Sequence, residues 1–353
     1  MKLYNDNFNC NMMEDYVICS DFSNFTGDVD RRDMLFSLTL GTNSGQSSNI
    51  VTARFKLRCY FKDSEIPTIE EVIDKCYPLD NNSHYSSKDH AEQLVARLSL
   101  IFGIRLKIGS KPCVWLKIAG SDEWNISDPL QFYREAYGAY HMRNRLIINT
   151  VCSSDIDDPE AKNFLKPSVS LNDCESYLEI FSRITDEQRS AITQASILYA
   201  EALWDAEDNP DIAWVKLVSA IEVAATGGRD NRTRKEEIFT SFISKNYCPS
   251  YCLKCNQKRG RVIADSELES ILKTIYNYRS RYLHNGRSFP PRMNDSPWEK
   301  VNDILKLNER PESNPSYNIS AGIKFETGDN PLFLWKFEEI VQESLKKWWR
   351  DIS

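Results

Sequence analysis

Hydrophobic and polar residues follow two different patterns along the chain. From residue 33 to about 151, short alternating runs predict strands, and apolar residues three or four positions apart predict helices between them. The predicted strands are residues 34–40, 50–61, 104–109, 114–120 and 145–151. The predicted helices are residues 68–77, 87–103 and 128–143. This mixture indicates an α+β domain.

The boundary of this domain is predicted near residue 160. The segment SSDIDDPEAKNFLKPS, residues 153–168, combines acidic residues, two prolines and small polar residues. Such a segment buries little apolar surface, which is typical of a linker. We therefore expect an α+β domain over residues 1–160 and a helical domain over residues 165–353.

Beyond the linker the hydrophobic spacing is almost entirely helical. The predicted helices are residues 170–183, 186–207, 210–226, 233–246, 266–285 and 331–350. Thr185 with Gln188, and Ser266 with Glu269, have the spacing of a capping box at the start of a helix. The last helix is expected to bury one stripe of residues: Phe337, Val341, Leu345 and Trp348. Consecutive amphipathic helices with mostly short connections predict an α-helical bundle.

Composition and charge narrow the class of protein. The 353 residues include 41% apolar residues and carry a formal net charge of -7, which suits a folded globular chain and argues against coating of nucleic acid or an anionic membrane. Any RNA-binding surface must therefore be local. The N-terminus lacks the apolar core of a secretory signal, and no run reaches membrane-spanning length, so we expect a soluble cytoplasmic protein with reduced cysteines.

A charged residue interrupts the apolar stripe of the helix predicted at 266–285. Continuing that stripe from Leu272 and Ile275 by steps of three or four residues leads to Arg279. An unpaired guanidinium at such a position is costly, so Arg279 requires a carboxylate or an anionic ligand. Glu222 follows Val218 on the apolar side of the helix at 210–226 and is the candidate partner. A buried structural ion pair and a ligand-binding arginine both fit this pattern.

His284 lies five residues after Arg279, just before Asn285-Gly286. Five residues correspond to about 140° around a helix, so the two side chains do not share one face. They converge only if the helix unwinds at its end or if two copies meet in a symmetric dimer. The negative end of the helix dipole favours an imidazolium that can act as a general acid, although a histidine that caps the last carbonyls also fits.

The stretch IYNYRSRYLHNG resembles the Arg-x4–6-His signature of the HEPN superfamily. Its detailed form, an aromatic residue, two residues, Arg-Ser and then His before a small residue, is similar to the Apea-like HEPN group. The upstream WVKLVSAIEVAATG is similar to the earlier helix of that group, whose Ala-x-Glu element supplies an acidic residue, here Glu222. The resemblance covers about residues 170–350. Ser280 follows the arginine where the wider superfamily often has Asn, Asp or His.

The resemblance implies a metal-independent ribonuclease site formed by Arg279 and His284, usually shared between two subunits. RNA cleavage by the 2′-OH requires a group that moves protons and a cation that holds the phosphorane charge, which suit His284 and Arg279. We expect further contacts to substrate from Tyr278, Ser280, Tyr282 and Arg287. Tyrosines at helical spacing also pack in cores, so the two tyrosines have that alternative.

A cysteine cluster lies between two predicted helices. Cys248, Cys252 and Cys255 form a C-x3-C-x2-C run, the tight spacing that converges on zinc, but no fourth ligand is nearby. A structural zinc site and free thiols in a loop both remain open. Five lysines and arginines between residues 245 and 261 form a local basic segment that suits phosphate contacts or a solvated loop.

Together these patterns predict an endoribonuclease with no catalytic cofactor, acting on RNA as a homodimer or higher oligomer. The N-terminal domain is expected to sense a trigger or restrain the nuclease. The resemblance implies a toxin-like effector of anti-phage defence that acts by abortive infection after an unidentified phage trigger. The alternative is a non-catalytic HEPN-type module that dimerises or binds a nucleotide.

Overall fold

The fold is given by a computed structural model of the whole chain. It describes residues 12–20, 25–31, 36–40, 53–61, 87–108, 113–117, 124–126, 169–227, 235–247, 251–252, 257–258, 265–294, 298–301, 304–307, 319–320, 323–325 and 329–352. The described residues belong to two compact units. The first lies within Met1–Leu98, Leu106–Arg143 and Ser168–Glu175, and the second within Ser99–Arg105, Asn144–Pro167 and Ser176–Ser353.

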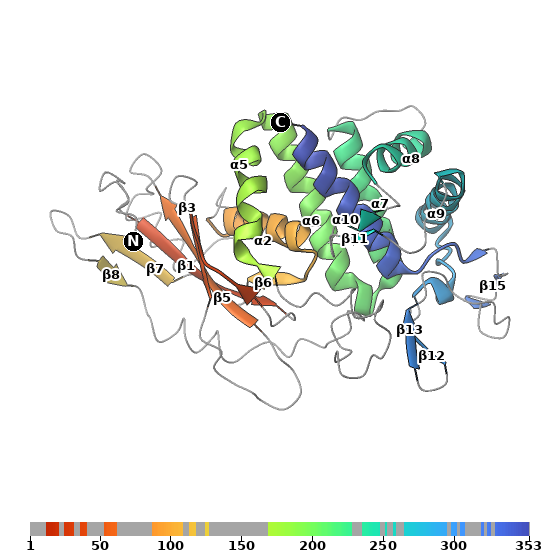
Figure 1. The fold of residues 1–353 in the computed structure, drawn as a ribbon, viewed down its shortest axis with the longest axis horizontal. Coiled ribbons are helices and arrows are strands. Elements are labelled where there is room, and N and C mark those ends of the chain that lie inside the picture. The colour runs from red at the N-terminus through yellow and green to blue at the C-terminus, as the bar shows by residue number, and fades with distance from the viewer. Residues whose placement is uncertain are drawn as a thin grey trace. The chain divides into compact units, whose positions relative to one another are not determined.

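The first unit contains an antiparallel sheet in the order β3-β4-β5-β1-β7-β8, with β6 also paired to β1 (Figure 1). Its strands are β1 (Met12–Ser20), β3 (Val29–Arg31), β4 (Phe36–Leu40), β5 (Ala53–Phe61), β6 (Leu106–Ile108), β7 (Cys113–Lys117) and β8 (Trp124–Ile126). β1 is central because it pairs with β5 over its whole length and also with β6 and β7. An N-terminal antiparallel sheet followed by a largely helical region is the fold class of this chain.

The register of the sheet forms one apolar row across neighbouring strands. Val29 pairs with Leu38, and Leu38 pairs with Leu57. All three side chains are at most 1% exposed, as is Ile18 of β1. Branched side chains that lie opposite one another on a buried face stabilise strand pairing, so this row fixes the register.

The sequence predicted some of the described elements in this unit and missed others. The strand predictions at 34–40, 50–61, 104–109 and 114–120 are confirmed as β4, β5, β6 and β7, and the helix prediction at 87–103 is confirmed as α2 (Ser87–Phe102). The predictions at 68–77, 128–143 and 145–151, and the linker, lie outside the described residues. The central strand β1 was not predicted, and neither were β3, β8 and the short parallel pair of β2 (Phe25–Thr26) with β9 (Val169–Ser170).

The second unit is built mainly from helices. They are α5 (Glu175–Arg183), preceded by the 3-10 turn Leu171–Cys174, then α6 (Asp186–Asp208), α7 (Pro210–Thr226), α8 (Lys235–Asn246), α9 (Asp265–Asn285) and α10 (Leu334–Asp351). α6 and α7 form a hairpin connected by Asn209, and α7 contacts α8, α9 and α10 (Figure 1). No described helix is long and apolar enough to cross a membrane.

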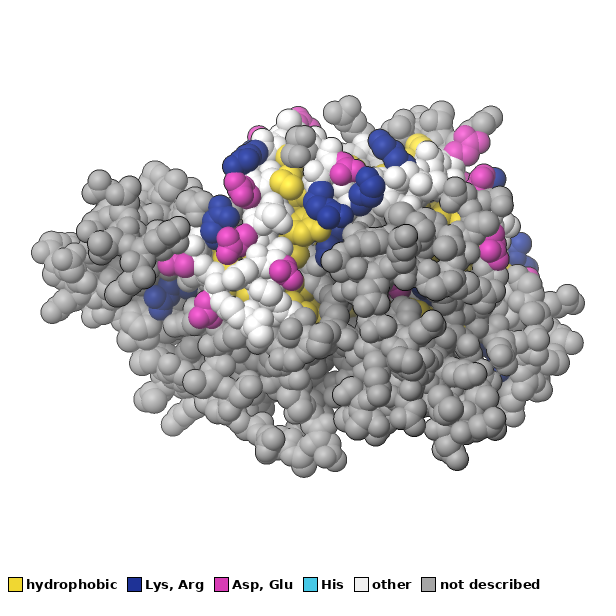
Figure 2. Space-filling model, in the orientation of Figure 1, with side chains coloured by type: hydrophobic (Ala, Val, Ile, Leu, Met, Phe, Trp, Pro, Cys, Tyr) yellow, Lys and Arg dark blue, Asp and Glu magenta, His cyan; other side chains and the backbone are white. Residues whose placement is uncertain are grey.

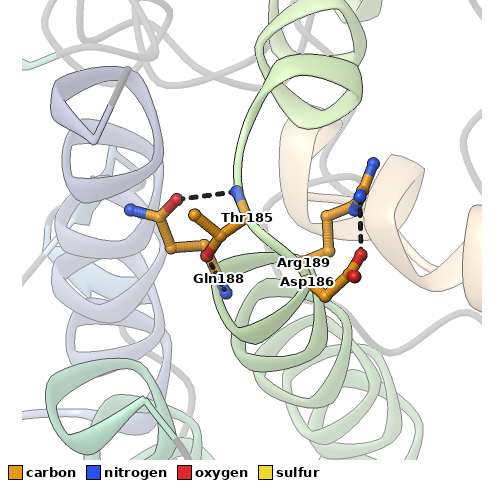
Figure 3. Close-up of polar contacts among 4 residues, drawn as sticks. All are labelled: Thr185, Asp186, Gln188 and Arg189. Atoms are coloured by element: carbon orange, nitrogen blue, oxygen red, sulfur yellow. Dashed lines mark hydrogen bonds and ion pairs between the residues drawn. The ribbon is translucent and has the colours of Figure 1, made fainter.

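The capping box predicted at the start of α6 is confirmed (Figure 3). The Thr185 hydroxyl accepts from the Gln188 backbone N–H at 3.3 Å, and the Gln188 side chain accepts from the Thr185 N–H at 3.0 Å. Asp186 in the first turn also pairs with Arg189 at 2.6 Å. The box satisfies two N–H groups that a helix start otherwise leaves without partners.

Three elements meet at one aromatic stack. Trp214 of α7 stacks between Phe289, which follows α9, and Phe337 of α10, with ring centroids 5.3 and 4.9 Å apart. All three rings are at most 1% exposed. Burial of such large rings supplies much of the stability of a helical core, so this stack is a main part of the core of the unit.

α10 differs from its prediction in one residue. Phe337, Val341 and Leu345 are buried as expected, but Trp349 is fully buried and Trp348 is only partly buried. The reason is that Trp349 continues the stripe by a step of four and packs edge-on against Tyr177 of α5. The prediction of Trp348 as the last core residue was therefore wrong.

The second unit also contains short strand pairs that the helical reading missed. They are β10 (Tyr251–Cys252) with β11 (Gln257–Lys258), β12 (Trp298–Val301) with β13 (Ile304–Leu307), and β14 (Ile319–Ser320) with β15 (Ile323–Lys324). The predicted capping box at Ser266 is also wrong, because α9 already begins at Asp265 and Glu269 pairs with Lys273 at 2.7 Å.

Candidate functional site

The candidate site begins with an ion pair between α7 and α9. Arg279 follows the buried stripe of α9, and its Nη2 lies 2.7 Å from Oε2 of Glu222 on α7. The pairing expected from the two apolar stripes is therefore confirmed. The two side chains are 17% and 16% exposed, so the pair is neither sealed in the core nor fully solvated.

A third residue completes this cluster. The hydroxyl of Tyr276, one turn before Arg279 on α9, donates to Oε1 of Glu222 at 2.9 Å. The Arg279 guanidinium also lies over the Tyr276 ring, 5.6 Å from its centroid. Burial, followed by the hydrogen bond to Glu222, raises the pKa of Tyr276 well above its usual value. We call Tyr276, Arg279 and Glu222 the α7–α9 cluster.

The cluster does not use all of the hydrogen-bonding capacity of Arg279. Its Nε is buried and has no hydrogen-bond partner among the residues that the structure describes. A buried donor without an acceptor costs about 1–3 kcal/mol, which makes it a feature that needs an explanation. Glu222 thus binds the guanidinium through Nη2, whereas Nε makes no hydrogen bond to the described residues.

His284 lies in the last turn of α9 and is exposed. The helix ends as the Asn-Gly signal predicted: Gly286 has φ 64°, its N–H donates to Tyr282 O at 2.9 Å, and Arg287 N–H donates to Arg281 O at 3.4 Å. The Gly286 bond is the 5→1 bond of an αL helix ending, for which glycine is favoured at the left-handed position. His284 is therefore presented to solvent by a well-defined helix end.

Arg279 and His284 do not meet within one chain. Arg279 points to α7 through Glu222, and none of the contacts among the described residues joins it to His284. This agrees with the angle of about 140° that separates the two positions on a helix. A site that uses both residues on one phosphate therefore needs a second copy of the chain, and that arrangement stays a prediction.

The predicted substrate-binding residues fall into different surroundings. Tyr278 is 5% exposed, contacts Phe289 and Phe325, and donates its hydroxyl to Asp329 O at 2.9 Å. Ser280 and Tyr282 are half-buried, whereas Arg287 is exposed. In this arrangement Tyr278 has the surroundings of a core residue, and Tyr282 and Arg287 are the more accessible candidates.

The segment after α9 is tied to α7 by two contacts that the sequence did not reveal. The carboxylate of Asp211 accepts from the Phe289 N–H at 3.1 Å, and the indole N–H of Trp214 donates to the Asn294 side chain at 2.8 Å. These bonds fix the chain on both sides of the Pro290-Pro291 pair. The exposed Arg287 is therefore placed by a structured connection.

The cysteine cluster lies mostly in a part of the chain that the structure does not describe. Cys248 and Cys255 lie outside the described residues, and of Cys252 only the backbone is described, in β10. Within the described part of the chain no group of three metal-ligating side chains comes together. The zinc site remains a prediction for these three cysteines.

Charge on the visible helical surface is mixed. Figure 2 shows Lys, Arg, Asp and Glu side chains interspersed over the described helices, with hydrophobic side chains between them. Among the described side chains of this face, Lys and Arg form no extended patch of one sign that would attract a polyanion at a distance. Neither a known protein family, nor a curated protein, nor a solved structure matches the chain.

Proposed function

We propose that this protein is a metal-independent endoribonuclease of HEPN type. The observation that carries the proposal is the Arg279–Glu222 pair: a partly exposed arginine of α9, held by a glutamate of α7, on the same helix that presents the exposed His284 at its end. RNA cleavage requires a cation that holds the phosphate and a group that moves protons, and this helix carries one residue of each kind.

The chemistry follows from what RNA supplies itself. The 2′-OH is an internal nucleophile that attacks the adjacent phosphorus, so the protein has to move protons and stabilise the pentacovalent phosphorane. We assign proton transfer to His284, either from the 2′-OH or to the 5′-oxygen that leaves. Arg279 holds the phosphate oxygens, and Glu222 orients Arg279.

A homodimer makes this assignment geometrically reasonable. Because the two side chains diverge on one helix, we propose that His284 of one subunit and Arg279 of another act on one phosphodiester. Tyr282 and Arg287 are proposed to contact the RNA beside it, since both are more accessible than Tyr278.

The biological setting is proposed from the resemblance to the Apea-like group. RNA cleavage inside a host cell stops its growth, which suits a toxin-like effector of anti-phage defence that acts by abortive infection. In this scheme the N-terminal sheet-containing region senses a phage trigger or restrains the nuclease, and the protein acts in the cytoplasm.

A non-catalytic HEPN-type module is the second candidate. It is favoured by the hydrogen bonds of Glu222, because each of its two carboxylate oxygens already accepts a hydrogen bond from a residue of the same chain. In that case the ion pair is structural, as one-sided loss of a buried pair is costly whatever its function. The module then dimerises or holds a nucleotide without cleaving it.

Cleavage of labelled RNA in excess EDTA distinguishes the two candidates. We expect the wild-type protein to cut RNA and to leave a 2′,3′-cyclic phosphate, and we expect His284→Ala and Arg279→Ala each to lower kcat/KM by at least about a hundredfold. RNA with 2′-O-methyl groups should resist cleavage because it lacks the nucleophile.

The matched control is Arg183→Ala, which removes the arginine of the Arg183–Glu179 pair on α5. Its side chain is 71% exposed and remote from α9 in sequence, so cleavage should be unchanged. Equal cleavage by wild type and by the His284 and Arg279 variants identifies a contaminating nuclease. Folded wild-type protein that never cuts RNA leaves the binding module as the function.

A further inference from the structure

Glu222 divides its two oxygens between two different donors. Oε1 accepts from the Tyr276 hydroxyl at 2.9 Å, and Oε2 accepts from Arg279 Nη2 at 2.7 Å. A carboxylate that faces an arginine without competition usually makes two parallel bonds to it. Here only one such bond is formed, and Arg279 Nε stays buried without a hydrogen-bond partner among the described residues.

The missing second bond has a direct physical reason. The tyrosine hydroxyl occupies one acceptor site of Oε1 and favours the carboxylate orientation that makes this bond over the orientation in which Oε1 faces Nε. We propose that Tyr276 is a positioning residue whose hydroxyl prevents Glu222 from closing fully on Arg279. This inference rests on the proposed function for its consequence, but the geometric part stands independently of it.

The consequence is that Arg279 is oriented without being fully neutralised. A single-contact partner holds the guanidinium in place and leaves it donors for a second anion, which under the proposed function is a phosphodiester of RNA. A closed two-bond pair satisfies the arginine internally and weakens its pull on phosphate. Tyr276 thus determines how many N–H donors of Arg279 remain available to a ligand.

The surroundings of Tyr276 suit this role. The side chain is 9% exposed, it packs against Phe239, and its ring lies beside the guanidinium. Burial raises its pKa, so the hydroxyl keeps its proton and remains a donor throughout the physiological pH range. A phenylalanine keeps the ring and its packing and removes only the hydrogen bond.

Tyr276→Phe tests the proposal by structure and by kinetics. In a crystal structure of this variant we expect Glu222 to rotate so that its two oxygens contact Nη2 and Nε of Arg279. In the RNA cleavage assay we expect kcat/KM to fall by about tenfold, while the thermal midpoint stays close to that of the wild type because the lost bond is replaced by a new one.

The matched control is Tyr199→Phe. Tyr199 is also a buried tyrosine that donates to a glutamate, Glu338 of α10, but it has no contact with Arg279. This variant should cleave RNA at the wild-type rate, even though it loses the same kind of hydrogen bond. A similar loss of activity in both variants shows a general effect of removing buried hydroxyls and overturns the proposal.

A second background isolates the interaction with Glu222. Glutamine cannot form the charged two-bond pair, so adding Tyr276→Phe to Glu222→Gln should change kcat/KM by less than about twofold. A full tenfold loss in that background overturns the proposal, since it means that the hydroxyl acts through something other than the carboxylate.

The outcomes separate this inference from the proposed function. If Glu222 keeps its single bond to Arg279 in the Tyr276→Phe crystal, the positioning role is wrong whether or not RNA is cut. If Glu222 closes on Arg279 but the wild type cuts no RNA, the positioning role stands and the ribonuclease proposal fails. If Glu222 forms both bonds to Arg279 in Tyr276→Phe but RNA cleavage is undiminished, the proposed effect of Tyr276 on activity is wrong.

Discussion

α9 and α10 are long helices of the same unit, and both carry charged residues on faces that pack against other helices. α10 is buried along most of its length: Lys336 and Glu339 are 1% and 2% exposed and face each other at 3.4 Å. α9 buries only one side of its earlier turns and leaves its last turn open, with His284 exposed and Leu283 49% exposed.

The contrast shows that a buried charge alone does not indicate a functional site. The pair in α10 is closed to solvent, and a ligand cannot reach it without unfolding the helix from its neighbours. The Arg279–Glu222 pair has side chains about one-sixth exposed and lies on the helix whose end is open. Access by a second anion, more than the presence of an ion pair, distinguishes α9 as the candidate site.

The largest effect on stability is expected from the loss of an aromatic ring of α10. Phe337→Ala should lower the free energy of unfolding by about 3–5 kcal/mol, because the Phe337 side chain is fully buried against Trp214. Leu283→Ala at the open end of α9 is the matched control and should change it by less than about 0.5 kcal/mol. Urea denaturation of both variants measures the difference; equal losses mean that the end of α9 is covered in solution.

A smaller effect on stability is expected when the α7–α9 cluster loses its carboxylate. Glu222→Leu leaves Arg279 without its carboxylate and should lower the free energy of unfolding by about 2–3 kcal/mol, less than for a sealed pair because both side chains are partly exposed. Adding Arg279→Met should restore part of that loss, since no uncompensated charge remains. Urea denaturation of the single and double variants measures this, and a double variant less stable than Glu222→Leu contradicts it.

The smallest effect on stability is expected from substitution of two glycines that have nearly the same φ angle. Gly286 at the end of α9 has φ 64° and nothing within 4 Å of an added Cβ, so Gly286→Ala should cost about 1 kcal/mol of unfolding free energy from backbone strain alone. Gly103, after α2, has φ 65°, but an added Cβ lies 2.4 Å from Gln342 of α10. Gly103→Ala should therefore cost about 2 kcal/mol, and equal thermal shifts contradict the distinction.

The sequence predicted the elements with long, regular patterns. α6, α7 and α9 were placed closely because each has an apolar stripe and clear end signals, such as Thr185 before α6 and Gly286 after α9. β1 was missed because its acidic residues obscure the alternation, and its role depends on pairing with β5, 33 or more positions away. The β12–β13 hairpin is too short for periodicity to reveal.

The candidate site was predictable only where a single helix face determines it. The stripes of α7 and α9 indicated that Glu222 and Arg279 face each other, and the structure places them in contact. The hydroxyl of Tyr276 and the anchoring residues Asp211 and Asn294 required knowledge of tertiary packing. The aromatic position before the arginine was visible in the motif, but nothing in the pattern indicated what its oxygen contacts.

The end of α2 depends on residues that the ribosome makes much later. Gln342 and Lys346 of α10 donate to the carbonyls of Leu100 and Ile101 at 2.8 Å each, across 242 and 245 residues of chain. These carbonyls are among those that a helix end leaves without internal partners. During synthesis, the last turn of α2 must therefore wait with water as its partner until α10 has emerged, which makes this contact a late step in folding.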